Sequence, residues 1–489
     1  MKLYSISYNK IPATKRFRTM SDPKTKIVSF TAAVRQFLEK PYQGGSLNIS
    51  WGYWQLVATR FLTVFFTLFI FPLDWKFYRS LLSLDFHFYH LLSLARYQPE
   101  WVPLSDQHGN PVLGAASFAN WAIIVFVSVV LTLVWSLTDK KRQNLIAELE
   151  WTKTIVRYRL ALVLIAYGVY QLFRLQIPYP SLSSLMTNYG DLYPWKIYYQ
   201  TTAISPLYSS FLGSVEILAG LLILNRRTTT MGAGLVIGFL GNVAAVNGFY
   251  DAGELSLSTL IVLMAVFLFS FDVVRLYQLL ILEKKALANR LVADYSASSL
   301  TKLRSAAKIS IAVFTLLLLV SAASSQANGP YKYPSQQGLK NSFGLYEVKH
   351  FVFNNDTIPH SKSDTRRWQD VVFEQWSTIS VKQNRPVIID RSSAEKLQLK
   401  DIDRNYEFAG LSGRHFYHYE LNATADTLLL TNKNRNHRNE TFKLAIKRPT
   451  DRYIELSGTD QAGNRIHAVL ERQDRKFMMY EGRRRAAKL

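Results

Sequence analysis

The chain has 489 residues, of which 48% are hydrophobic and 13% aromatic, and its formal net charge is +23. It has no cysteine, which excludes disulfides, thiol redox chemistry, cysteine nucleophiles and thiolate-bound metal centres. The basic excess comes without a nucleic-acid motif and lies largely in the N-terminal segment and in loops between apolar runs. We therefore expect a lipid bilayer as the main surroundings and no nucleic-acid partner.

The first part of the chain predicts a basic segment followed by two membrane helices. Residues 1–50 are polar and basic and lack the apolar core of a signal peptide, so we expect a cytoplasmic segment. Apolar runs at 51–73 and 118–138 are long enough to span a bilayer. The aromatic stretch between them, 74–117, predicts an interfacial or partly re-entrant helix in an outer loop. Residues 51–157 thus form an N-terminal group of membrane helices.

Four more apolar runs predict an α-helical bundle over residues 158–280. The expected spans are 158–177, 206–224, 230–250 and 256–280. A tight basic turn joins the middle two, and their glycines would let helix backbones approach closely in lipid. These glycines are Gly213, Gly220, Gly232, Gly234, Gly238 and Gly241.

A basic linker at 281–308 leads to a last, short apolar run at 309–325. Lysines precede this run and the sequence SSQANG follows it, which resembles an internal signal sequence with a small-residue cleavage region. The alternative is a retained anchor that tilts or sits in a thin membrane. We favour the anchor and count it as the seventh span.

The loop charges predict one orientation in a bacterial inner membrane. The basic segments are 1–50, 139–156, 225–229 and 281–308. The loops at 177–205 and 251–255 hold Lys196 as their single basic residue. Cytoplasmic loops carry the excess of lysine and arginine, so the N-terminus is expected in the cytoplasm. Seven spans then place the C-terminal domain in the periplasm.

Residues 330–482 change from apolar runs to alternating ones. The strand-like runs are YEVKHFVF, DVVFEQWSTISVKQ, RHFYHYELNA, DTLLLTN, TFKLAIK, RYIELSG and RIHAVLERQ. Turn signals such as NND, NRP and DQAGN separate them. The spacing predicts an antiparallel barrel or sandwich of about eight short strands, similar to a lipocalin. This domain is the expected contact for a protein partner.

Three polar residues at similar depth predict an intramembrane site. Glu216 lies about halfway along the fourth span, Arg60 along the first and Asn242 along the fifth. A carboxylate in hydrocarbon is expensive and marks a functional site by default. The functional interpretation is a buried pair of Arg60 and Glu216 with Asn242 as hydrogen-bond partner. The structural alternative is a clamp that fixes helix register, and Arg60 could also snorkel to an interface.

A second polar cluster is expected at the outer mouth of the bundle. Its residues are Gln171, Arg174, Asn188, Asp191, Asn247, Asp251 and Glu254. The cluster could bind a headgroup, a quinone ring or a small anion. Polar caps at the membrane interface are the structural alternative.

We assign no metal site. Asp85, His87 and His90 lie on one segment, and His87 and His90 could share a helical face. A metal needs a further ligand that the sequence does not identify, so we interpret these histidines as interfacial residues among aromatics.

A series of short motifs occurs in order from residue 158 onward. In the bundle these are Arg159, Tyr167, Gly168, Phe173, Leu175 to Pro178, Tyr189 to Asp191, Phe211, Gly213, Glu216, Gly220, Arg226 to Thr230, Asn242, Asn247, Tyr250 and Asp251. The β domain adds Gly344 to Val348, Arg366 to Trp368, Val371 to Phe373 and Leu470 to Arg472. The order of these motifs resembles the DoxX-like membrane proteins, in their long form with extra N-terminal helices and a C-terminal soluble domain.

The resemblance implies a DoxX-type four-helix bundle and a link to membrane oxidoreductases, some of which handle quinones or thiols. This chain departs from the long form at Gln171, Leu255 and Leu260, where lysine, a polar or basic residue and histidine are usual. Catalytic residues and the cofactor are therefore left unassigned, with a quinone as the candidate cofactor. The function expected first is the membrane subunit of a redox system. The alternative is a non-catalytic scaffold that presents the β domain to a partner.

Overall fold

The structure is a computed structural model of the chain. It describes residues 51–83, 85–99, 101–102, 115–142, 144–176, 179–285, 298–327, 336–388, 400–403, 413–422 and 426–482. The prediction made for the N-terminal segment 1–50 and parts of those made for the outer loop and the basic linker lie outside these residues.

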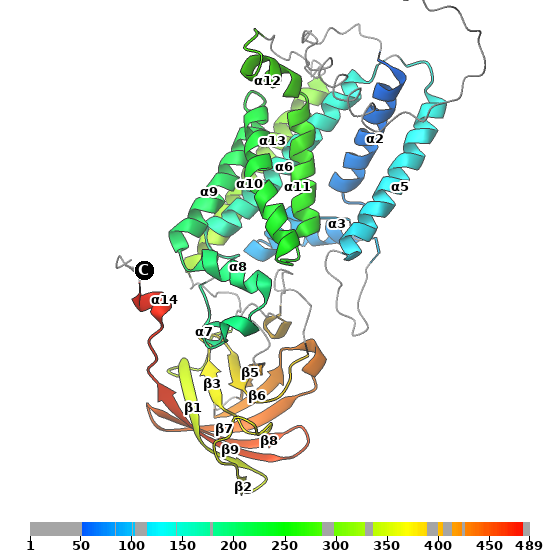
Figure 1. Cartoon of the computed structure of the whole chain (residues 1–489). Coiled ribbons are helices and arrows are strands. Elements are labelled where there is room, and N and C mark those ends of the chain that lie inside the picture. The colour runs from blue at the N-terminus through cyan, green and yellow to red at the C-terminus, as the bar shows by residue number, and fades with distance from the viewer. Residues whose placement is uncertain are drawn as a thin grey trace, which may run out of the picture. The chain divides into compact units, whose positions relative to one another are not determined.

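Six described helices are long and apolar enough to cross a membrane. They are α2 (Tyr53–Ile70), α5 (Ala115–Thr138), α6 (Ile146–Leu172), α9 (Pro206–Leu224), α10 (Thr229–Phe249) and α13 (Ser298–Ala327). A seventh span results if α11 (Leu255–Ser270) and α12 (Val273–Leu280) count as one. The predicted all-α membrane region is confirmed, although the run at 256–280 forms two helices. Figure 1 shows α6, α9, α10 and α11 side by side.

Helix α12 belongs to a separate compact unit of the chain. Asp272 precedes its first turn, with its Oδ1 atom 3.7 Å from Nη1 of Arg275. A carboxylate at a helix N-terminus also meets the positive end of the helix dipole. This short helix is therefore stabilised from within its own segment.

Threonine hydroxyls in the turn between α9 and α10 cap the C-terminal end of α9. Thr228 donates its hydroxyl to the Leu222 carbonyl at 2.6 Å, and Thr229 donates to the Asn225 carbonyl at 3.0 Å. The last carbonyls of a helix have no partner within the helix. These hydroxyls supply one, which explains why an apolar hairpin contains a run of threonines.

Helices α6 and α9 touch through their backbones at two glycines. A Cβ atom on Gly213 would lie 2.5 Å from the Gly168 carbonyl oxygen, and one on Gly168 would lie 2.7 Å from the Gly213 carbonyl oxygen. Small residues permit such an approach in membrane bundles. Gly220 and Gly232 also pack closely against neighbouring helices, as expected. The expectation is wrong for Gly238 and Gly241, which have nothing within 4 Å.

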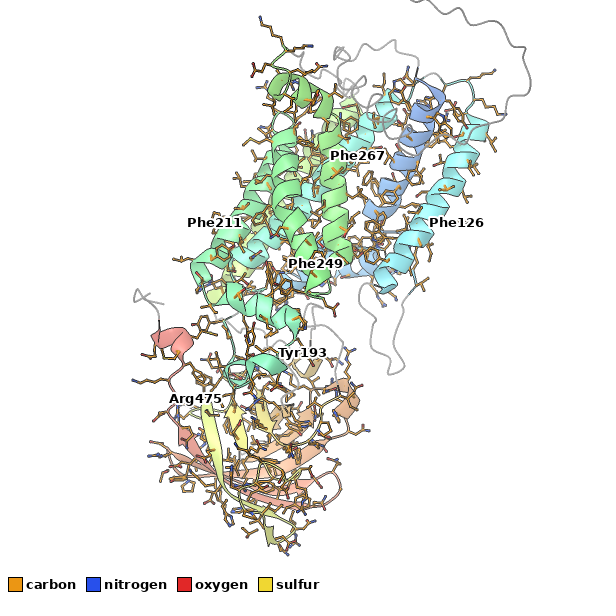
Figure 2. All side chains as sticks on the ribbon, in the orientation of Figure 1. Phe126, Tyr193, Phe211, Phe249, Phe267 and Arg475 are labelled. Carbon is orange, nitrogen blue, oxygen red and sulfur yellow. The ribbon has the colours of Figure 1, made fainter. Side chains whose placement is uncertain are left out.

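The outer surface of the helices is apolar. Phe126, Phe211 and Phe249 are 69%, 58% and 88% exposed, and Figure 2 shows them on α5, α9 and α10. Phe267 instead points inward, with its ring centroid 4.7 Å from that of Phe66. Large exposed apolar surfaces mark protein or membrane contacts, and their position on spanning helices fits contact with lipid.

The aromatic stretch after α2 forms two short helices, α3 (Trp75–Leu82) and α4 (Phe88–Ala95). Helix α3 has no buried residue, whereas α4 buries Phe88 and Leu92 in a cluster with α6 and α13. Leu318 and Ala322 of α13 are fully buried in the same cluster. The last apolar run is therefore packed into the helical region.

The C-terminal domain is a closed antiparallel barrel. Its strands are β1 (Gly344–Phe353), β2 (Asp356–Thr357), β3 (Asp370–Phe373), β4 (Thr378–Lys382), β5 (Arg414–Leu421), β6 (Thr427–Asn432), β7 (Thr441–Thr450), β8 (Tyr453–Asp460) and β9 (Arg465–Gln473). Neighbours pair in chain order, and β9 returns to β1. The two-residue β2 extends β1 only, so the closed ring has eight strands. The predicted barrel is confirmed.

Alternation of side chains fills the barrel. Tyr417 and Tyr419 of β5 lie in the same core as Trp368 and Phe373, as the period of two requires. Closure removes the exposed edges that an open sheet would present. Short elements complete the described chain: η2 (Asp401–Asp403), η3 (Arg435–His437) and α14 (Met478–Glu481).

The loop between α6 and α9 contacts the barrel. It contains α7 (Leu182–Leu185), η1 (Tyr189–Asp191) and α8 (Pro194–Ala203). Ser183 donates its backbone N–H to Oε1 of Glu374 at 2.8 Å, and its hydroxyl lies 2.7 Å from that of Ser380. All three residues are buried. This polar contact joins the loop to β4 and the turn before it.

Candidate functional site

A cavity of about 130 Å³ lies among α6, α9, α10 and α11, with α8 at one side. Its polar lining residues are Gln171, Gln176, Thr202, Glu216, Asn242, Asn247, Glu254 and Ser258. Its aromatic lining residues are Tyr167, Tyr198, Tyr199, Tyr208 and Phe239. Concave, mainly apolar sites with a few convergent polar groups are the usual form of small-molecule sites.

Glu216 is the central residue of this cavity. The whole residue is 5% exposed, and its Oε2 atom is enclosed without a hydrogen-bond partner among the described residues. It sits on α9 one turn beyond Gly213, where α9 touches α6. A buried polar group without a partner costs free energy, so this carboxyl group does not serve stability.

Three predicted residues join Glu216 at the cavity wall. Asn242 lines the cavity from α10 and is exposed. Gln171 of α6 and Asn247 of α10 are each 8% exposed. Asn247 donates its side-chain N–H to the Ser258 hydroxyl at 3.0 Å, which ties α10 to α11. The structure thus combines residues from the two predicted clusters into one site.

Glu254 also lines the cavity, and both of its carboxylate oxygens have a partner. Tyr167 donates its hydroxyl to Oε2 at 2.6 Å, and Arg96 forms an ion pair with Oε1. The Arg96 guanidinium also lies 5.6 Å from the centroid of the Tyr167 ring. Arg159 holds the segment that carries Arg96 by donating to the Ala95 and Tyr97 carbonyls at 2.7 and 2.6 Å.

Arg60 is not part of this site, so the expected pair with Glu216 is wrong. Arg60 is 3% exposed and donates to the Ser136 hydroxyl at 3.2 Å and to the Asp139 carbonyl at 2.8 Å. Its Nη2 atom lies 3.9 Å from the Asp139 carboxylate. Both partners lie at the end of α5, and α2 packs on α5 and α6. Arg60 therefore joins two membrane helices.

Four other residues of the expected outer-mouth site, Arg174, Asn188, Asp191 and Asp251, are not among the residues of the cavity wall. Arg174 and Asp251 are exposed and have positive φ angles of 57° and 53°, just after α6 and α10. Asp191 accepts a hydrogen bond from the Asn188 side chain at 3.0 Å within its own loop. These residues have the role of turn and cap residues at helix ends.

The aromatic wall of the cavity was missed by the sequence analysis. Tyr198 and Tyr199 come from α8, a helix that begins with Pro194 at its first position. In the sequence, this proline followed by tyrosines was the signal that could have indicated a short aromatic helix. Because α8 is short and only partly apolar, hydropathy alone does not bring it to the bundle.

The barrel domain has a half-buried carboxylate, Glu440, whose two oxygens are both engaged. Arg385 donates to its two oxygens at 2.6 and 2.9 Å. Asn432 donates at 2.9 Å and the Tyr417 hydroxyl at 3.2 Å. Burial alone would raise the pKa of Glu440, but the hydrogen bonds and charge of Arg385 outweigh it and lower that pKa.

His415 lies beside this network. Burial and then the positive charge of Arg385 lower the pKa of His415 to about 4. The Arg385 guanidinium lies 3.4 Å from its Nδ1 atom, and its Nε2 atom is buried without a hydrogen-bond partner among the described residues. Burial also raises the pKa of Tyr417, and the Glu440 carboxylate adds to that shift. His415 is therefore neutral in the folded barrel at neutral pH.

The histidine segment before α4 forms a local acid–base pair. The Nδ1 atom of His87 lies 2.6 Å from Oδ1 of Asp85, and that of His90 lies 3.9 Å from Oδ2. Within the described ranges, no group of three or more His, Cys, Asp or Glu side chains is arranged to hold a metal ion.

Comparison of the chain with known protein families, with curated proteins and with solved structures finds no match.

Proposed function

We propose that this chain is a DoxX-like multi-pass protein of a bacterial inner membrane that binds a small ligand inside its helix bundle. The observation that carries this proposal is the enclosed carboxyl group of Glu216, which has an oxygen without a partner in a cavity. A carboxyl group buried in this way lowers stability. A ligand that meets it would offset that cost and account for its position.

The narrower role is a membrane subunit of a quinone-linked or other redox system. The resemblance to DoxX-like proteins implies this role, and two features of the cavity support it. Aromatic rings line it, and the side-chain amides of Gln171 and Asn242 can donate hydrogen bonds to carbonyl oxygens of a ligand. The role proposed for these residues is binding, with no catalytic residue among them.

The proposed orientation places the N-terminus in the cytoplasm and the barrel in the periplasm. The support is the positive charge of the loops on one side of the spans. Burial of Leu318 and Ala322 in the helical region supports a retained last anchor. A reporter fused after residue 335 is expected to be active on the exported side only, and cytoplasmic activity would overturn the orientation.

The ligand-binding function can be tested on the full chain, purified from its native membrane. Small molecules extracted from the wild type are compared by mass spectrometry with those from Glu216→Gln. Glu420→Gln, at an exposed position on β5, is the control. We expect a molecule that co-purifies with the wild type and the control but is lost from Glu216→Gln. Equal contents in all three proteins would refute the proposal.

A scaffold function is the second candidate, and the contact between α7 and the barrel favours it. Ser183 binds Glu374 and Ser380 in a buried position, which fixes the loop to the barrel wall. A protein that presents a domain to a partner benefits from such a fixed attachment. Cross-linking in intact cells through the barrel should capture a reproducible protein partner, and none would be captured if this candidate is wrong.

A further inference from the structure

The described wall of the cavity in the helix bundle contains acidic side chains and no basic one. Among its described lining residues none is lysine, arginine or histidine, and the ionisable acids are Glu216 and Glu254. Glu254 is compensated, because Arg96 and Tyr167 engage its two oxygens. Glu216 has an enclosed oxygen without a partner and forms no ion pair with a described residue. One acidic group is thus left for whatever occupies the cavity.

The rest of the wall is suited to a positive charge. The lining includes Tyr167, Tyr198, Tyr199 and Tyr208 together with Phe239. The face of an aromatic ring carries partial negative charge and attracts ammonium and guanidinium groups. The Tyr167 ring already has such a neighbour in the guanidinium of Arg96, 5.6 Å from its centroid. A cavity lined by aromatic rings and one acidic group without a partner has the composition of the cages that bind quaternary ammonium ions.

The size of the cavity limits the ligand. Its volume of about 130 Å³ exceeds that of a single water site and falls below the roughly 300 Å³ where drug-sized ligand sites begin. Only a small headgroup fits inside the bundle. An apolar tail, if the ligand has one, would extend past the exposed Asn242 and the half-exposed Tyr208.

We propose that the ligand held by this cavity is an organic cation, a protonated amine or quaternary ammonium headgroup that pairs with Glu216. The inference rests on the proposed ligand-binding function and names the class of ligand. A neutral quinone offers only acceptor oxygens, which leave an ionised carboxylate without compensation. A cation supplies the missing charge and contacts the tyrosine rings. The amides of Gln171 and Asn242 then meet polar substituents of the ligand.

The test measures binding of two ligands of the same shape. Choline and its uncharged isostere 3,3-dimethylbutan-1-ol are titrated by calorimetry into the full chain in nanodiscs, with a short-chain ubiquinone as a third probe. We expect choline to bind at least about tenfold more tightly than the isostere, because only choline carries a charge that can pair with the carboxylate and the ring faces. Equal binding of the two would overturn the proposal and indicate a protonated Glu216.

Variants locate the binding in the cavity. Glu216→Gln keeps the shape and removes the charge, so it should reduce choline affinity at least about tenfold while leaving the isostere unchanged. Glu420→Gln should bind choline like the wild type. Tyr198→Leu, in α8 rather than in a spanning helix, should weaken choline severalfold and provides a test if Glu216→Gln does not fold.

The outcomes separate this inference from the function on which it rests. If ubiquinone binds and is sensitive to Glu216→Gln while choline does not bind, the cation class is wrong and ligand binding stands. If no probe binds and no molecule co-purifies with the wild type, both proposals fail. Choline binding that Glu216→Gln and Tyr198→Leu leave unchanged would place the cation elsewhere and overturn the inference.

Discussion

The helix bundle encloses Glu216 and the barrel domain half-buries Glu440, and the surroundings of the two carboxyl groups are opposite. Glu440 in the barrel meets Arg385, Asn432 and Tyr417, so its charge and its hydrogen bonds are satisfied. Glu216 in the bundle has an enclosed oxygen with no partner among the described residues. A satisfied carboxylate holds a structure together, whereas an unsatisfied one weakens it. From this difference we infer a structural role for the barrel network and propose a ligand-binding role for the bundle cavity.

The two networks also differ in their origin along the chain. The hydrogen-bond partners of Glu440 all come from the barrel domain, so this network links residues within that one domain. The neighbours of Glu216 come from α6, α8, α10 and α11, and they leave a space instead of filling it. Four predictions test this contrast, in order of decreasing expected effect on stability.

Removing the satisfied carboxylate should have the largest effect. Glu440→Ala leaves the guanidinium of Arg385 beside His415 without its counter-charge and removes several hydrogen bonds to a charged group, which together contribute about 3 kcal/mol. Amide hydrogen exchange of β5 and β6 in the full chain measures the loss. Glu420→Ala on the exposed face of β5 is the control. Protection equal to that of the wild type would show that the network is not structural.

Acid should weaken the barrel next. The pKa of His415 is about 4 in the folded barrel and 6.5 in the unfolded chain. Below pH 6.5 the unfolded chain binds a proton that the folded barrel does not, so stability is complete above that pH and falls as the pH drops toward 4. Between pH 7 and pH 5 we expect a loss of about 2 kcal/mol.

The lowered pKa of Glu440 acts in the same direction, at pH values below its ordinary value of 4.5. Hydrogen exchange of β5 at pH 7 and pH 5, corrected for the intrinsic exchange rate, tests the sign. His415→Gln should remove most of the dependence above pH 5. A barrel that becomes more protected in acid would contradict the assignment of a neutral buried histidine.

Loosening the loop from the barrel should have a smaller effect. Ser183→Ala deletes the hydroxyl contact with Ser380 and keeps the backbone bond to Glu374, which costs about 1 kcal/mol. Faster hydrogen exchange or proteolysis within α7 would report it. Ser214→Ala is the control, since that hydroxyl bonds only to the Ser210 carbonyl of its own exposed helix turn.

Changing the unsatisfied carboxyl group should leave the bundle as stable as before or stabilise it by up to about 1 kcal/mol, because an uncompensated charge is removed. Thermal unfolding of Glu216→Gln in detergent, without ligand, measures this. A clear loss of stability would mean that Glu216 is a structural residue, and the contrast with Glu440 would disappear.

Much of the fold follows from the sequence because the signals are periodic. Apolar runs of membrane length marked the spans, and alternation marked the barrel strands, including the run that the turn after Phe373 divides into β3 and β4. The two-residue β2 was missed because a strand of that length has no periodicity. Element type is therefore a local property that the residues themselves express.

The site was predicted less completely for a geometric reason. Counting residues gives the depth of Glu216 and Arg60 along their helices. It does not give the direction in which each side chain points or which helix lies opposite. Glu216 and Asn242 line the same cavity because a short turn joins α9 and α10, although the structure describes no hydrogen bond between the two, whereas Arg60 on α2 bonds to α5. The position of Tyr198 in the cavity wall depends on the loop that carries α8 folding back onto the bundle. No local sequence pattern indicates that fold.

The backbone contact between Gly168 and Gly213 limits the routes by which a ligand could enter the helix bundle. At this contact the backbones of α6 and α9 touch without side chains between them. A ligand could pass between the two helices there only if they moved apart. The cavity is closed at that contact, whereas Asn242, elsewhere on its wall, is exposed and the tyrosines of α8 are half-buried. A ligand would enter laterally from the bilayer or past α8. The contact between α6 and α9 would then form the rigid side of that entrance.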